Sequence, residues 1–201
     1  MEIDSVEQLR GHYRPAQGRA LDKQLDHLDP HCMHFIGLSP FVVLATGAAT
    51  GQLDASPRGG APGFVRVLDR HTLLLPDARG NNRLDSFSNI AASGRAGLLF
   101  LIPGVDETLR VNGDARLSAD PALLAHFAGE RNAPQLVMRL HVREAYLHCA
   151  KALMRSRLWD SAARVERSVL PSMGQMINDQ TGSAAAPESQ AQMLARYAPD
   201  L

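Results

Sequence analysis

The stretch Phe41-Val42-Val43-Leu44-Ala45-Thr46 decides the fold of this chain. It is continuously apolar and partly β-branched, which is typical of a buried strand in the middle of a sheet. Similar short runs follow it and are separated by Gly, Pro, Asn and Asp: 53–56, 64–68, 72–75, 96–102, 108–117 and 136–147. Short strands punctuated in this way predict an antiparallel barrel or sandwich.

Proline residues mark two kinds of local feature, a break in a strand and the start of a helix. Pro57-Arg58-Gly59-Gly60 is expected to interrupt its strand, because Pro lacks a backbone donor and Gly weakens a strand interior. Such an interruption lets a ligand approach the backbone closely. Asp29-Pro30 and Asp120-Pro121 each predict a helix start, with Asp as the N-cap and Pro at the first helical position.

The chain divides into three parts on this pattern. Residues 1–40 form an N-terminal helical segment, 41–160 the β-rich domain, and 161–201 a C-terminal helical tail. The first helix of interest carries His31, Cys32 and His34, with His27 just before it. A soft-metal site is one interpretation, but the ligand spacing is poor, and a packed helix with Cys32 as a small apolar residue is favoured.

The loop from Asp77 to Asn82 is the most informative for function. Asn81 or Asn82 is expected to cap a helix whose apolar stripe is Leu84, Phe87, Ile90 and Ala91. Free N–H groups at a helix start attract anions, and Arg79 and Arg83 stand beside them. The loop therefore suits a phosphate; the alternative is an ordinary capped helix with solvated arginines.

Two further groups of side chains have open interpretations. In 108–117 one face is apolar and the other carries Arg110, Asn112, Asp114 and Arg116, so Arg110 and Asn112 either meet a ligand or belong to a solvated outer face. Lys151, Arg155 and Trp159 stand at roughly one-turn spacings. They either clasp an aromatic cofactor or decorate the surface.

Composition sets the broad class. The 201 residues suffice for one sizeable core, and the formal net charge of zero gives no general attraction for nucleic acid. Only two cysteines are present, the first residues lack the pattern of a signal peptide, and no apolar run is long enough to span a bilayer. We expect a cytoplasmic protein that binds neither nucleic acid nor membrane. The lack of net charge weakly favours an oligomer.

Taken in order, these motifs resemble the pyridoxamine 5′-phosphate oxidase-like FMN-binding split-barrel family. The resemblance runs over about 40–117 and 136–159 and is carried by Pro40 to Thr46, Ser56-Pro57-Arg58-Gly59, Gly80 to Leu84, Leu109 to Gly113 and His148 to Leu153. It implies a mainly β fold with flanking helices, a six-stranded antiparallel split barrel. It also implies a homodimer with FMN at the subunit interface.

The resemblance also assigns residues to the cofactor site. Arg58, Asn82 and Arg83 would hold the FMN phosphate, with Ser56 and Pro57 along the ring. Arg110 and Asn112 would approach from the next strand. Lys151, Arg155 and Trp159 would come from the partner chain or close the substrate side.

The implied activity is flavin-mediated hydride transfer with a small-molecule substrate or NAD(P)H, and the flavin itself carries the chemistry. True pyridoxamine phosphate oxidases carry Ser-Arg-Lys where this chain has Asn81-Asn82-Arg83, and their C-terminal Arg-x-His motif is not evident. Activity on pyridoxamine phosphate is therefore not implied. Two alternatives stay open: a non-catalytic flavin-binding or sensing protein, and a haem-binding split barrel with His141 or His148 as axial ligand.

Overall fold

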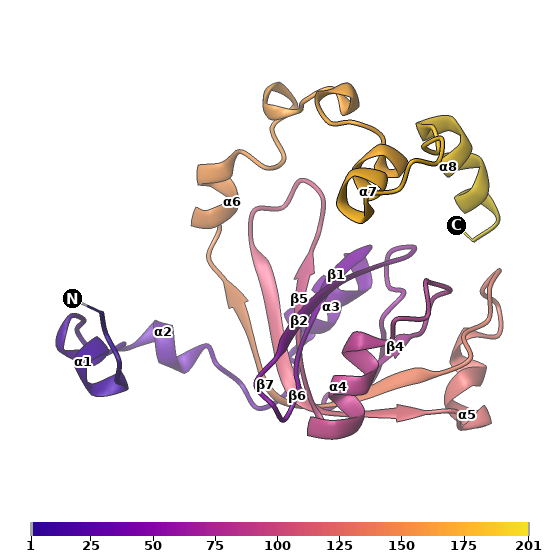
Figure 1. The fold of residues 1–201 in the computed structure, drawn as a ribbon. Helices are drawn as coiled ribbons and strands as arrows, with labels where there is room; N and C mark the ends of the chain where they lie inside the picture. Colours follow the sequence, from indigo (N-terminus) through magenta and orange to yellow (C-terminus); the bar gives the residue numbers. More distant parts are fainter. Residues whose placement is uncertain (1, 201) are drawn as a thin grey trace.

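The computed structural model describes residues 2–200 and centres on one antiparallel sheet (Figure 1). The seven strands run in the order β2-β1-β5-β6-β7-β4-β3. Their bounds are β1 Phe41–Gly47, β2 Leu53–Gly59, β3 Arg66–Asp69, β4 Thr72–Pro76, β5 Arg95–Leu101, β6 Thr108–Ser118 and β7 Val137–His148. The mainly β architecture is confirmed, but the sheet has seven strands rather than the expected six.

The edge strand β2 differs from its prediction. It continues through Pro57 and Arg58 to Gly59 and stays paired with β1, so the expected interruption at Pro57 is wrong. An edge strand tolerates Pro because the ring nitrogen can face away from the neighbouring strand. The chain then crosses from one edge of the sheet to the other, where β3 lies.

The described residues also form eight α-helices. Their bounds are α1 Val6–Gly11, α2 Arg19–Asp22, α3 Pro30–Leu38, α4 Asp85–Ser93, α5 Pro121–Leu124, α6 Lys151–Ser156, α7 Met173–Thr181 and α8 Gln190–Tyr197. Both Asp-Pro helix starts are confirmed: Asp29 accepts from the Cys32 N–H at 2.7 Å, and Asp120 accepts from the Ala122 N–H at 2.9 Å.

The core lies between the sheet, α3 and α4. Helix α3 inserts Cys32, Phe35 and Ile36 into the same buried cluster as the central strands. Burial raises the pKa of the Cys32 thiol to about 12, so this side chain stays a neutral, apolar thiol. The packed-helix interpretation of this segment is confirmed.

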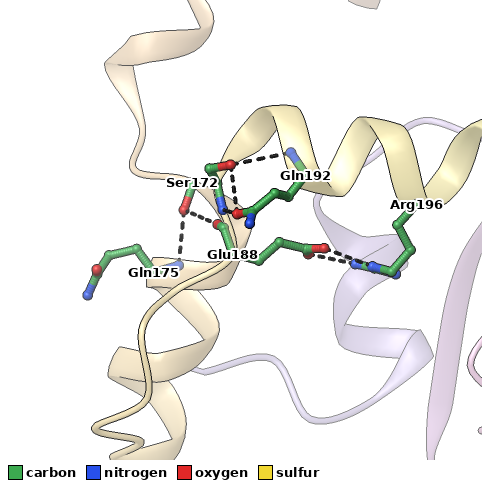
Figure 2. Close-up of polar contacts among 6 residues, drawn as sticks. Ser172, Gln175, Glu188, Gln192 and Arg196 are labelled. Atoms are coloured by element: carbon green, nitrogen blue, oxygen red, sulfur yellow. Dashed lines mark hydrogen bonds and ion pairs between the residues drawn. The ribbon is translucent and has the colours of Figure 1, made fainter.

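The C-terminal helices α6 to α8 run over one end of the sheet, whereas α1 and α2 extend to the side (Figure 1). None of these five helices buries a residue. Figure 2 shows how polar contacts hold α7 and α8 together: Ser172 Oγ donates to the Glu188 carbonyl oxygen at 2.9 Å, and Arg196 pairs with the Glu188 carboxylate at 2.7 Å. The tail is thus ordered by polar contacts rather than by a core of its own.

Among residues 2–200 no helix is both long and apolar enough to cross a bilayer.

Candidate functional site

Three polar side chains of β2 face the inside of the fold. In the register of β1 and β2, Arg58 lies opposite Val42 and Ser56 opposite Leu44, and both of those apolar partners are fully buried. Directly opposed residues in an antiparallel pair share one face of the sheet. Asp54, Ser56 and Arg58 therefore point to the side that α4 covers.

Arg58 is the centre of a group that we call the Arg58 cluster: Asp54, Ser56, Arg58, Asp77 and Ser86. The Arg58 guanidinium donates to Ser56 Oγ, and to Ser86 Oγ at 3.4 Å. Ser86 is itself 3% exposed and donates to Asp54 Oδ2 at 2.5 Å. The cluster thus joins the edge strand to the first turn of α4 through a half-buried cation.

Asp77 adds a second carboxyl group to this cluster. Its pKa is raised above the usual range because the side chain is partly desolvated, and the nearby Arg58 charge opposes that rise. Two carboxyl groups therefore lie near one guanidinium.

The start of α4 differs from the prediction that Asn81 or Asn82 caps it. The N-cap is Leu84, in the left-handed region with φ 57°, and it makes no side-chain capping bond. Asn81 Oδ1 instead accepts from the Arg83 N–H at 3.1 Å, and Asn82 also has a positive φ of 59°. Asn tolerates this conformation and uses its side chain within its own turn. The first N–H groups of α4 thus receive no capping side chain and can donate to an anion.

The two other arginines of the loop are exposed and paired. Arg83 Nε donates to Asp85 Oδ2 at 2.8 Å, and this bond raises the pKa of Arg83 above its usual range. Arg79 lies 3.5 Å from Asp200, which brings the C-terminal tail to the loop. Arg83 therefore stands near the start of α4, but in solvent.

Arg110 and Asn112 lie on the outer face of β6, away from the Arg58 cluster. Arg110 stands 5.2 Å from the ring centroid of Tyr146, and Asn112 donates to Glu144. A hollow of about 450 Å³ lies over this face of β1, β5, β6 and β7. Two strands separate β6 from β2, so the two groups are roughly 14 Å apart along the sheet and on opposite faces. Within one chain they do not line one pocket.

The third predicted group lies around α6. Arg155 Nε donates to the Lys151 carbonyl oxygen at 3.0 Å, and Trp159 Nε1 donates to the Val105 carbonyl oxygen at 2.8 Å. Trp159 also lines a hollow of about 390 Å³ with Arg157 and Met154. The indole thus fastens the start of the tail to the β5–β6 loop.

The structure adds Asp54, Asp77 and Ser86 to the residues expected at the site. Ser86 carries no motif, and it reaches Arg58 only because α4 lies against β2. The two histidines considered for haem lie elsewhere: His141 stacks on His71, and His148 Nδ1 lies 3.3 Å from the Cys149 carbonyl oxygen.

Comparisons with known proteins point to one family. A family model described as pyridoxamine 5′-phosphate oxidase matches residues 28–149. No curated protein matches the chain. Among solved structures, a histidine-to-alanine variant of HupZ from Group A Streptococcus matches with 18% sequence identity and a TM-score of 0.50. The match covers 60% of this chain and 98% of the HupZ chain.

Two other structures match less well in shape. A putative pyridoxamine 5′-phosphate oxidase from Lactobacillus delbrueckii has 21% identity and a TM-score of 0.49, over 62% of this chain and 98% of its own. The FAD binding protein from Mycobacterium smegmatis has 17% identity and a TM-score of 0.44, over 62% of this chain and 97% of its own. At these identities the HupZ match shows a likeness of fold alone.

Proposed function

Because the chain belongs to the pyridoxamine 5′-phosphate oxidase family, we propose that it binds FMN, with the Arg58 cluster as its phosphate site. The observation that carries this proposal is the half-buried Arg58 guanidinium beside the uncapped start of α4. A phosphate needs several charge-assisted donors, and a guanidinium, a serine hydroxyl and helix N–H groups supply them.

The residues present fit such a cofactor. Arg58 and Ser86 would donate to the phosphate from one side, and the N–H groups of the first turn of α4 from another. Asn82 and Arg83, which lie in the preceding loop, would close over it, and Ser56 and Pro57 would lie along the ring. A bound flavin would supply the hydride-transfer chemistry. The protein would then need to position and orient the flavin and its substrate and to exclude water, rather than provide an acid or base.

We further propose a homodimer in which the cofactor lies at the subunit interface. Arg110, Asn112, Lys151, Arg155 and Trp159 do not share a pocket with Arg58 in one chain. They can meet the same cofactor only if a second copy brings them. Exposed apolar side chains on the terminal segments support a partner surface: Val6, Leu9, Leu21, Val169, Leu170 and Ile177.

The activity that fits this site best is flavin-dependent oxidoreduction, with a small molecule or NAD(P)H as the partner of the flavin. A flavin-binding or sensing protein without turnover is the alternative. The two free cysteines, of which Cys149 is exposed, suit a cytoplasmic setting.

The test is an absorption titration of the purified full chain with FMN, repeated with riboflavin, followed by anaerobic addition of NADPH and then NADH. Tighter binding of FMN than of riboflavin supports the phosphate site. Bleaching by either nucleotide supports an oxidoreductase, whereas binding without bleaching favours the sensing role. Failure to bind any flavin refutes the proposal.

A further inference from the structure

Three histidines from distant parts of the sequence meet at one corner of the fold. His27 precedes α3, His71 lies in the β3–β4 turn, and His141 lies on β7. The ring centroids of His27 and His71 are 5.9 Å apart, and those of His71 and His141 are 6.0 Å apart. These side chains have no part in the proposed flavin site.

The backbone holds the three positions in place. The Leu28 N–H donates to the Arg70 carbonyl oxygen at 2.8 Å, and the Val142 N–H donates to the His71 carbonyl oxygen at 2.8 Å. Leu28 is fully buried, and this anchors the residue next to His27. The backbone at these positions is thus fixed, while the His71 and His141 side chains are exposed.

One of the three rings is already oriented as a metal ligand is. His27 Nδ1 lies 2.7 Å from Asp26 Oδ1. A carboxylate on Nδ1 selects the tautomer that leaves Nε2 as the free ligand nitrogen, as in the carboxylate–histidine pairs around bound zinc.

We propose that His27, His71 and His141 form a binding site for a divalent transition-metal ion such as Zn²⁺. Three neutral imidazoles suit zinc, nickel or copper, and they leave one coordination position open to water. Two imidazoles on one tetrahedral ion have ring centroids about 5 Å apart, given zinc–nitrogen bonds of about 2.1 Å. The two observed separations, His27 to His71 and His71 to His141, would each need to shorten by about 1 Å, and the His27 and His141 rings would approach the ion from either side of His71.

Binding requires side-chain rotation. In the present conformation no group of three His, Cys, Asp or Glu side chains within residues 2–200 is arranged to hold an ion. We expect metal binding to turn the exposed His71 and His141 side chains toward His27 Nε2. The ion would connect the segment before α3 to the β3–β4 turn and to β7.

The test uses the full chain without a polyhistidine tag, stripped with chelator and titrated with Zn²⁺ by calorimetry. We expect one ion per chain, with affinity at least tenfold weaker in His71→Ala and in His141→Ala. Asp26→Asn should keep the stoichiometry and weaken binding by about 10- to 100-fold. The matched control is His126→Ala, an exposed histidine outside the group, which should bind as the wild type does.

Two readouts separate a metal site from a general effect on folding. Zn²⁺ should raise the midpoint of thermal unfolding of the wild type, and chelator should reverse the rise; without metal the variants should melt as the wild type does. Co²⁺ should give the visible bands of a tetrahedral site, and these should be lost in His71→Ala. Absence of saturable Zn²⁺ binding, or binding that survives both alanine variants, would overturn the proposal.

Discussion

Replacement of Arg58 by alanine is the sharpest perturbation of the proposed phosphate site. The guanidinium is half-buried and already donates to Ser56, the Pro57 carbonyl oxygen and Ser86, so it is held in one position. A hydrogen bond to a charged group contributes about 1.5–3 kcal/mol net. Its loss corresponds to a dissociation constant for FMN about 10- to 150-fold higher.

The assay is a fluorescence titration of Arg58→Ala and wild type with FMN and with riboflavin. Riboflavin lacks the phosphate, so its affinity should change by less than about twofold if Arg58 acts only on that group. Arg58→Lys keeps the charge but not the forked donor geometry, and should fall between the two. Arg83→Ala should lose less, because Arg83 is exposed and its Nε is already bonded to Asp85.

Folding must be followed in the same samples. Arg58 links β2 to α4 by bonds to neutral groups, so Arg58→Ala should lower the free energy of unfolding by about 1 kcal/mol per lost bond. An equal loss of affinity for FMN and riboflavin would show that Arg58 maintains the shape of the site and does not bind the phosphate. Unchanged FMN affinity would refute the assignment.

Three other predictions concern stability and can be read by chemical denaturation. Between pH 9 and pH 10 the wild type should lose about 1 kcal/mol of stability relative to Cys32→Ala. Burial raises the pKa of the Cys32 thiol from 9.0 to about 12 in the folded protein, so only the unfolded chain releases the thiol proton in that window. Trp159→Phe should cost about 1 kcal/mol through loss of the bond to the Val105 carbonyl oxygen, and should speed proteolysis of the tail. Gly113→Ala should cost more than about 2 kcal/mol, because the new Cβ would lie 2.0 Å from the His141 carbonyl oxygen.

Each of these has a clear contrary result. Parallel pH profiles for the wild type and Cys32→Ala would mean that the thiol is solvated. A tail as resistant to protease in Trp159→Phe as in the wild type would show that the indole does not fasten it. Gly37→Ala is the matched control for Gly113→Ala, since nothing lies within 4 Å of the added Cβ; similar losses in both would remove the steric explanation.

Features set by neighbouring residues were predictable from the sequence. The Asp-Pro starts at Asp29 and Asp120 formed as expected, because capping needs only residues two or three positions away. The alternation of β6 correctly divided Leu109 and Val111 from the outward residues, since the strand period is fixed by the backbone. The prediction that Asn81 or Asn82 caps α4 was wrong, because the helix begins from a left-handed turn at Leu84 without a capping side chain.

Features that join distant segments were not predictable in this way. The sequence marked Arg58 but not Ser86, because their contact depends on where α4 packs. In the same way, His27 was considered with its neighbours His31 and Cys32, whereas its ring contacts His71. Cys32 was correctly interpreted as a packed residue, because a free cysteine usually behaves as a small apolar side chain. No local pattern of this kind pairs a turn with a strand that lies far along the chain.

The resemblance to the family assigned both Arg58 and Arg110 to one cofactor, yet the sheet separates them by two strands and sets them on opposite faces. A single chain cannot satisfy that assignment, because neither side chain can reach through a packed sheet. Either a second copy presents its outer face to the Arg58 cluster, or Arg110 belongs to no flavin site. Arg110→Ala measured for both FMN affinity and oligomeric state decides between them: a loss of affinity in an intact dimer requires the shared site, and unchanged affinity assigns Arg110 to the Tyr146 contact alone.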